Sequence, residues 1–461
     1  MSEQSVKNKV AVTSSRPRPT LMSTGRFRGL GLVLTLALVI RLALLAGNIS
    51  DHPWFFFQDL EKVESEISST ETPYMNAFGF EASNIAHAWV CANQGYASPF
   101  GGSTGPTAWI APGVVTFYVL SFTLWGCFTF NSILFSFFLA LVCSGITTVV
   151  VFQVGSRVGR DPRVGFLSAL FFACLPFEAW IFQISGQLDF NLQVLWFAVL
   201  LLAVLRAADS KGLFAGFEFG FLSAIAALFN PGLLLCAAVG VVFAIRGRSV
   251  REKAGFTFFF AAACVTFLGP YVVVQSFRVG GFVLVKSNAG FETYLGNTRE
   301  ARGLLQNAAF QAHHPSQNAT EFVHYGEVGE FEYLQETQRR LSEDLQFREF
   351  LENTVRRTFY FFLAYEVKPW DYSTTVSAIK AALWTVPIMS FLGLIVMRRG
   401  RLKAAEGLVI LFTLAYSLPY LLTGVMERYR IPIVSAAALF LALLTWELIV
   451  VCHGGRDTWL S

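Results

Sequence analysis

FGFE at residues 78–81 and GGSTGPTAW at residues 101–109 belong to one polar stretch that interrupts an otherwise very hydrophobic chain. This stretch follows the first long hydrophobic segment and places the carboxylate of Glu81 on a short helix, ahead of a loop rich in Gly, Ser and Pro. The pattern predicts a helix over residues 81–93, with Gly95 as its stop signal. Backbone N–H groups of the loop can hold a phosphate, but no Gly-Lys-Ser/Thr follows, so the loop is not a P-loop.

The composition around this stretch is that of a membrane protein. Hydrophobic residues make up 54% of the 461 residues and charged residues only 14%, whereas a soluble domain has about 25% charged residues. A soluble core cannot bury that much apolar surface, so the chain is predicted to be an all-α polytopic membrane protein. The net charge of +4 is modest and spread along the chain, which gives nucleic-acid binding little support.

Charge also predicts the topology. Apolar segments long enough to cross a bilayer lie near residues 28–47, 131–153, 164–182, 190–205, 212–229, 231–245, 254–276, 378–397, 404–422 and 431–451. If the run 108–127 lies on the outer surface and does not cross, the short basic loops 155–163, 206–211, 246–253 and 398–403 all fall on one side. The positive-inside rule therefore favours ten crossings with both termini cytoplasmic. Eleven or twelve crossings are the alternatives.

These crossings divide the chain into parts. We expect a disordered cytoplasmic tail at 1–27, an N-terminal transmembrane module at 28–276 with a large first loop at 48–130, a second large extracytoplasmic loop at 277–355, and a C-terminal transmembrane module at 356–461. Within the second loop, residues 329–345 carry apolar residues at helical spacing among charges. That spacing predicts a surface helix, lying on the membrane or packed on the first loop.

The seven cysteines lie mostly within hydrophobic runs and show no CxxC spacing. This distribution predicts buried free thiols, with neither a disulfide nor a metal centre.

Charged residues at the outer ends of the spans are the strongest candidates for chemistry. Asp189 stands at the outer end of a hydrophobic span, where ionisable groups are costly and often functional. Arg428 and Arg430 precede the last span on the outer side, against the positive-inside trend, and arginine pairs well with phosphate oxygens. Structural explanations stay open for each group. Glu81 can stabilise its helix simply by standing at the N-terminus. Asp189 can reach the lipid headgroup layer, and the two arginines can anchor the chain at the membrane interface.

The second loop adds further candidates. Lys286 opens it in a segment that mixes a cation, amides and aromatic rings, as sugar and lipid-phosphate sites do. Polar side chains of both loops and of the last outer turn are candidates for contacts with a substrate, namely Asn84, Ser103, Thr104, Asn288, Tyr294 and Glu427.

In their order along the chain, these motifs resemble the GT-C superfamily of integral-membrane glycosyltransferases, most closely the bacterial members related to protein O-mannosyltransferases and the lipid A aminoarabinose transferase. The resemblance covers nearly the whole chain and rests on GFE at 79–81, SPFG at 98–101, GPTAW at 105–109, KSN at 286–288, YLGN at 294–297 and ERYRIP at 427–432. It implies a GT-C-like fold whose two large extracytoplasmic loops carry surface helices, with a catalytic carboxylate in the first loop. Asp189 matches an acidic residue of the second outer loop in that family. Many relatives have an Asp-Glu pair where this chain has Phe80 and Glu81, so that pair is absent here.

The resemblance implies transfer of a sugar from a polyprenyl-phosphate donor to an acceptor hydroxyl at the extracytoplasmic face. We expect an inverting displacement with Glu81 as the base and Asp189 positioning the sugar or the acceptor. Arg428, Arg430 and Lys286 would bind the donor phosphate. No metal ligand and no certain cofactor is assigned, and a divalent cation is an open alternative.

The expected partners are the polyprenyl-phosphate sugar, an acceptor lipid, glycan or protein, and membrane lipids, and the expected location is the bacterial inner membrane. A transporter or flippase of lipid-linked saccharides is the main alternative function. A non-catalytic scaffold of envelope assembly is the second.

Overall fold

The computed structural model describes residues 24–453 except 52, 75–77, 211, 213, 302 and 364–373. Within these residues the regular structure is helical, apart from isolated bridges between Ala97 and Pro106 and between Leu304 and Val425. The all-α prediction is therefore confirmed. Most of the predicted tail at 1–27 lies outside the described residues, and the first helix begins at Thr24.

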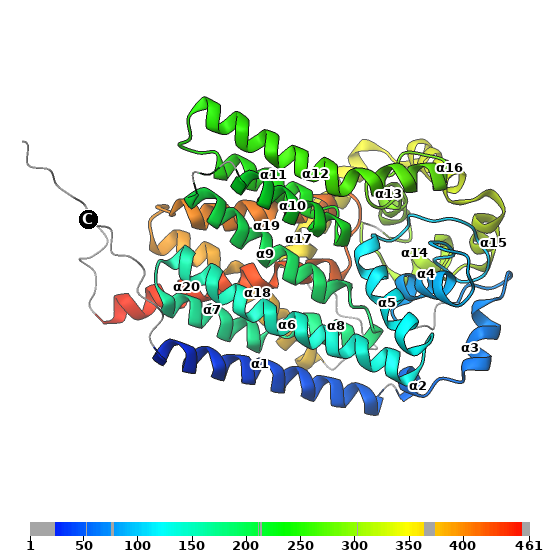
Figure 1. The fold of residues 1–461 in the computed structure, drawn as a ribbon, viewed down its shortest axis with the longest axis horizontal. Coiled ribbons are helices and arrows are strands. Elements are labelled where there is room, and N and C mark those ends of the chain that lie inside the picture. Colours follow the sequence, from blue (N-terminus) through cyan, green and yellow to red (C-terminus); the bar gives the residue numbers. More distant parts are fainter. Residues whose placement is uncertain are drawn as a thin grey trace, which may run out of the picture.

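The larger part of the molecule is a bundle of apolar helices that run side by side (Figure 1). It contains α1 (Thr24–Asp51), α6 (Phe130–Gly159), α7 (Pro162–Cys174), α8 (Phe177–Ser185), α9 (Asp189–Asp209), α10 (Phe214–Phe229), α11 (Leu233–Ala244), α12 (Val250–Val279), α18 (Thr374–Met397), α19 (Ala404–Leu422) and α20 (Val434–Cys452). Val, Leu, Phe and Ala side chains fill the largest core of this bundle.

Shorter helices gather mainly at one end of the bundle, which we call the loop end (Figure 1). The first loop supplies α2 (Pro53–Phe56), α3 (Leu60–Ile67), α4 (Phe80–Val90) and α5 (Pro112–Trp125). The second loop supplies α13 (Ala289–Asn297), α14 (Asn307–His313), α15 (Ala319–Val328), α16 (Glu330–Asp344) and α17 (Phe347–Phe362), and the 3-10 helix η1 (Glu427–Ile433) leads into α20.

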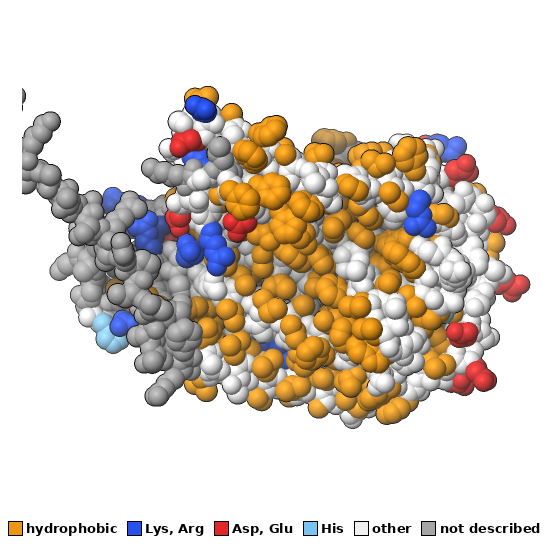
Figure 2. Space-filling view, viewed as in Figure 1, with side chains coloured by type: hydrophobic (Ala, Val, Ile, Leu, Met, Phe, Trp, Pro, Cys, Tyr) orange, Lys and Arg blue, Asp and Glu red, His pale blue; other side chains and the backbone are white. Residues whose placement is uncertain are grey.

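Seven helical segments among the described residues are long and apolar enough to cross a membrane: Gly29–Gly47, Phe130–Gly159, Pro162–Gln183, Asp189–Asp209, Val250–Val279, Ala404–Leu422 and Glu427–Cys452. The predicted spans 212–229, 231–245 and 378–397 correspond to shorter apolar helices. The polytopic membrane class is thus confirmed, while the number of ten crossings stays a prediction. Figure 2 shows a broad apolar surface across the middle of the molecule, with acidic side chains at the loop end.

The predicted basic loops meet at the opposite end, which we call the basic end. Arg157 forms an ion pair with Asp209 at 2.9 Å, and Arg248 donates hydrogen bonds to the carbonyl oxygens of Ala207 and Ser210. The guanidinium of Arg163 lies over the ring of Trp446, and the neighbouring Glu447 pairs with Arg398. All four basic loops therefore share one end of the bundle, as the sequence predicts.

α5 occupies most of the ambiguous run 108–127. A helix of 14 residues is about 21 Å long, short of the ~30 Å hydrocarbon core. Val114, Val115 and Tyr118 of α5 pack in one core cluster with Ala82 and Ile85 of α4. α5 thus lies along the first-loop helix, in keeping with a surface element.

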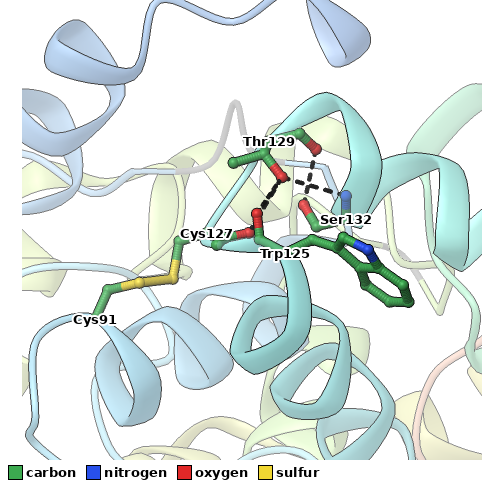
Figure 3. The surroundings of a disulfide bond; sticks show 6 residues. Cys91, Trp125, Cys127, Thr129 and Ser132 are labelled. Carbon is green, nitrogen blue, oxygen red and sulfur yellow. Dashed lines mark hydrogen bonds between the residues drawn. A yellow bond between two sulfur atoms is a disulfide. The ribbon is translucent and has the colours of Figure 1, made fainter.

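The cysteine prediction is wrong for one pair. Cys91, which caps α4, and Cys127, in the turn after α5, form a disulfide across 36 residues of sequence (Figure 3). Sequence spacing gives no sign of a pairing made by the tertiary fold. Among the other cysteines, Cys143 and Cys236 are buried thiols as predicted, whereas Cys174 and Cys452 are exposed.

Two predicted helices of the loops are present. The helix expected at 81–93 runs from Phe80 to Val90, so it ends earlier than predicted, because Asn93 and Gly95 adopt positive φ angles. The helix expected at 329–345 is α16, Glu330–Asp344, and it is packed on the first loop.

Candidate active site

A polar cavity at the loop end brings together five of the predicted site residues. Glu81 comes from the first turn of α4, Asp189 from the first residue of α9, Lys286 and Asn288 from the segment before α13, and Arg428 from η1. These segments are far apart in the sequence. The fold therefore places four parts of the chain around one space.

Other polar side chains that sequence reasoning did not single out also line the cavity, namely Gln187, Gln193, Asn230, Glu292, Tyr420 and Tyr429. Glu292 stands four residues after Asn288, on the same face of α13. That spacing is the feature of the sequence that points to Glu292 as a site residue. Asn230 follows the end of α10, and its amide nitrogen donates to Gln193 Oε1 at 2.8 Å and to the Tyr420 hydroxyl at 2.8 Å. No pattern in the sequence links these residues of three separate spans.

The position of Glu81 depends on the turn before α4. Gly79 adopts φ +83°, and a Cβ at this position would lie 2.8 Å from the ring of Tyr118. A non-glycine residue would thus be strained and would overlap a buried ring. The turn brings the helix N-terminus, with Glu81 in its first turn, to the cavity.

The turn before Asp189 is built against the same tyrosine. The Tyr118 hydroxyl donates to the carbonyl oxygen of Gly186 at 2.6 Å and accepts from the N–H of Leu188 at 3.1 Å. Gly186 has φ +65°, and a Cβ there would lie 2.2 Å from the ring of Phe78. One buried tyrosine therefore fixes the turns that carry Glu81 and Asp189.

The buried carboxylate of Glu330 holds the part of the cavity wall that contains Trp109 and Lys286. Glu330 Oε1 accepts from the N–H of Ala108 at 2.8 Å and from Ser287 Oγ at 2.7 Å. Its Oε2 accepts from the hydroxyls of Thr107 and Tyr325. Because Ala108 and Ser287 are the neighbours of the cavity residues Trp109 and Lys286, Glu330 joins the two loops at the site.

Polar contacts also fix the remaining cavity side chains. Arg428 Nη1 donates to Gln187 Oε1 at 3.2 Å. The carboxylate of Glu292 lies 3.4 Å from the Tyr429 hydroxyl, and its Oε1 lies 3.4 Å from Asn288 Nδ2. Glu292 is therefore turned toward η1, next to the arginine.

Charge in the cavity is nearly balanced, with three carboxylates facing an ammonium and a guanidinium. Burial raises the pKa of Glu81, although Arg428 and Lys286 act in the opposite direction. The pKa of Glu292 is also raised by burial, again against Lys286 and Arg428. These carboxylates are therefore more basic than exposed ones, as a proton acceptor at the site requires.

Two oxygen atoms in the cavity wall, Asp189 Oδ1 and Asn288 Oδ1, are buried without a hydrogen-bond partner among the residues that the structure describes. Buried polar atoms are usually paired, so such atoms in a cavity mark places where a polar ligand can bind.

The three carboxylates of the cavity are candidate ligands for a divalent cation. Among the described residues, the one group of three or more His, Cys, Asp or Glu side chains with ligating atoms mutually within 4.8 Å is His87, Cys91 and Cys127. Glu81, Asp189 and Glu292 therefore do not form a compact carboxylate cluster, and two cations share their cavity.

Three predicted residues of the first loop lie outside the cavity lining. Asn84 is buried and donates to the carbonyl oxygens of Tyr74 and Pro99, which fixes the loop on α4. Ser103 is exposed and accepts a hydrogen bond from Gln94. Thr104 is buried beside the loop that contains Ser98.

The other three also lie elsewhere. Tyr294 belongs to the aromatic core of the second loop and contacts His313. Arg430 is buried with its guanidinium over the ring of Trp384, and it pairs with Glu427, which is about half exposed. These places fit a scaffold role, and Arg428 is the arginine that reaches the cavity.

No protein-family model matches the chain, and the search of curated proteins gives no match. The chain is similar in structure to the archaeal oligosaccharyltransferase AglB from Archaeoglobus fulgidus in complex with an inhibitory peptide and a dolichol-phosphate, with a TM-score of 0.50 and 11% identity. It is also similar to the apo form of the Archaeoglobus fulgidus oligosaccharyltransferase, with a TM-score of 0.53 and 13% identity.

Each similarity covers 94% of this chain and 51% of the solved one, so this chain spans about half the length of those proteins. AglB has the GT-C fold, and the predicted GT-C-like fold is therefore confirmed.

Proposed function

We propose that this protein is a membrane glycosyltransferase that moves a sugar from a polyprenyl-phosphate donor to an acceptor hydroxyl. The observation that carries the proposal is the convergence of Glu81, Asp189, Lys286 and Arg428 on one cavity. A base for the acceptor and cations for a leaving phosphate are the groups that this reaction needs. The dolichol-phosphate bound to AglB supports a lipid-linked phosphate as the donor class.

In the proposed reaction, Glu81 takes the proton of the acceptor hydroxyl as its oxygen attacks the anomeric carbon. The bond between that carbon and the donor phosphate oxygen breaks, and the electron pair leaves with the phosphate. Arg428 and Lys286 stabilise the developing negative charge. Because the leaving group is a phosphate, it needs this charge stabilisation more than protonation. In the proposed reaction, the chain's own cations supply it.

Asp189 and Asn288 would orient the reactants, because each offers a buried oxygen without a partner to a sugar or acceptor hydroxyl. Gln193, Asn230 and Tyr420 line the cavity from the membrane helices and the turn after α10. They add further groups for sugar hydroxyls. Glu292 is a third carboxylate at the site, and its contacts to Asn288 and Tyr429 suit it to hold the acceptor.

We place this site on the extracytoplasmic face. Basic loops gather at the opposite end of the bundle, which the positive-inside rule assigns to the cytoplasm. The Cys91–Cys127 disulfide stands at the loop end, and disulfides persist in oxidising compartments. Both observations support an outward-facing cavity.

The test begins with cells that contain or lack the protein. An accumulating polyprenyl-phosphate sugar in the deleted strain would identify the donor. Purified protein in lipid nanodiscs is then given this donor and an extract of acceptors. We expect transfer by the wild-type protein and none by Glu81→Gln, with equal expression and thermal stability.

The exposed Glu332 of α16 gives the matched control, because Glu332→Gln removes the same charge away from the cavity. Wild-type turnover by Glu81→Gln would remove Glu81 from the mechanism. Transport of the donor across vesicles without any sugar transfer would favour the flippase instead.

A further inference from the structure

A second group of reactive side chains lies outside the cavity, at the far end of the helix that carries Glu81. His87 and Cys91 are four residues apart on α4 and so share one face of the helix. Cys127 meets them from the turn between α5 and α6. One ligating atom from each of the three residues lies within 4.8 Å of the others.

His87 has a buried ring nitrogen that forms no hydrogen bond with the described residues. This nitrogen is Nε2, and the side chain is 6% exposed. The ring stacks on Phe128 at a centroid distance of 5.7 Å, which fixes its plane. A neutral imidazole can offer its unprotonated ring nitrogen to a ligand.

The turn that carries Cys127 is rigid. Thr129 Oγ1 donates to the carbonyl oxygen of Trp125 at 2.8 Å and accepts from the N–H of Ser132 at 3.3 Å (Figure 3). Ser132 Oγ donates in turn to the Thr129 carbonyl oxygen. These hydrogen bonds hold the backbone around Cys127 without using the disulfide.

We propose that His87, Cys91 and Cys127 form a binding site for Zn²⁺ when the disulfide between the two cysteines is reduced. A dithiol reductant supplies two electrons and two protons, the sulfur–sulfur bond breaks, and the reductant leaves as its own disulfide. Zn²⁺ then binds the two sulfurs as thiolates and releases their two protons. The neutral His87 binds through Nε2 without losing a proton.

Zinc is the cation that this ligand set favours. Two thiolates and one imidazole match the sulfur and nitrogen ligands of tetrahedral zinc, whereas magnesium and calcium take oxygen ligands. Cys91 is exposed and Cys127 partly so, which lets water fill the fourth position. The metal would thus replace the covalent link between the end of α4 and the α5–α6 turn under reducing conditions.

The test measures metal content and does not depend on activity. Full-length protein carrying Cys174→Ser and Cys452→Ser, which removes the two exposed free thiols, is prepared oxidised and reduced. Both forms are equilibrated with Zn²⁺, desalted and analysed by atomic emission. We expect about one Zn²⁺ per chain in the reduced form and none in the oxidised form. Thiol titration on the same samples verifies the redox state.

A His87→Phe variant keeps an aromatic ring against Phe128 and removes the nitrogen ligand. We expect the reduced variant to lose the bound zinc while its melting temperature without metal stays close to that of the reduced parent. Equal zinc contents in the oxidised and reduced parent would overturn the proposal. Full zinc binding by reduced His87→Phe would also overturn it, since the thiolates alone would then hold the metal.

Discussion

The backbone N–H of Gly79 donates a hydrogen bond to the carbonyl oxygen of Ser185 at 3.1 Å. This bond ties the turn before Glu81 to the turn before Asp189, two residues that are more than 100 positions apart in the sequence. The two carboxylates of the proposed mechanism are therefore held in one local framework. Changes in that framework should alter catalysis even where no reacting group is touched.

Glycine substitutions test this framework. Gly79→Ala and Gly186→Ala place a Cβ at positive φ, which costs roughly 1–2 kcal/mol, and each Cβ would overlap a buried ring. We expect both variants to unfold at lower temperature and to lose most transfer activity. Gly280→Ala is the matched control, because Gly280 has φ +83° but no atom within 4 Å of its Cβ. If Gly280→Ala were as damaging as the others, the ring contacts would be irrelevant.

The pH dependence of transfer tests Glu81 as the base. A base works when ionised, and burial raises the pKa of Glu81 above its usual value. Activity should therefore fall as pH drops through that raised pKa, at a higher pH than an exposed carboxylate would give. Lys286 lowers the pKa of Glu81, so Lys286→Gln should move the acidic limb of kcat/KM to still higher pH. An unmoved limb would mean that another group is titrating.

The two arginines of η1 allow a matched comparison. Arg428→Gln removes a cation from the cavity and should lower kcat/KM by about 10²–10³, the usual cost of losing one transition-state donor. Arg430 lies in the core against Tyr360 and Trp384. Arg430→Gln should therefore lower the melting temperature much more than the activity of the folded fraction. Steady-state kinetics and thermal unfolding of both variants check the assignment, and a reversed pattern would contradict it.

Glu330 should act through stability and position. Glu330→Ala leaves the donors of Ala108, Ser287 and Tyr325 without their acceptor inside the protein. The expected loss is about 2–4 kcal/mol of unfolding free energy. The apparent affinity for the polyprenyl-phosphate sugar should also fall, because Lys286 is no longer held in place. Glu343→Ala on the exposed face of the same helix should cost less than about 0.5 kcal/mol. Equal melting temperatures for the two variants would refute the anchoring role.

Chelation tests the ligand argument for the cavity. Because its carboxylates do not gather into a compact group and cations of the chain face them, EDTA should leave transfer by the oxidised protein within about twofold of its rate. Loss of activity that Mg²⁺ or Mn²⁺ restores would show that the cavity takes up a metal ion on substrate binding.

Much of the architecture follows from the sequence, because hydrophobic runs and basic loops act over short distances along the chain. The same logic identifies Asp189 and Arg428, since charged residues at the ends of apolar spans stand out by their cost. Glu81 stands out for a different reason, its place on a short helix ahead of the Gly-rich stretch of the first loop. Asn84 and Tyr294 were candidates on residue type alone. Their buried partners, the Tyr74 carbonyl and His313, show scaffold contacts that residue type cannot distinguish from ligand contacts.

Long-range pairings were the part that spacing could not predict. Cys91 and Cys127 look like two thiols of apolar runs until the fold brings α4 and the α5–α6 turn together. The role of Glu292 is not apparent from the sequence, because its contact with Tyr429 joins residues 137 positions apart. Such contacts depend on how helices pack, which one sequence does not reveal.

Glu330 also limits how the protein can be altered as a set of modules. The one carboxylate accepts hydrogen bonds from Thr107 and Ala108 of the first loop and from Ser287 at the start of the second. Neither loop is therefore structurally independent of the other. A chimaera that imports a foreign second loop must bring a matching acceptor for the resident first loop. Changes of acceptor preference, in the laboratory or in evolution, should therefore arise by coordinated exchange of both loops.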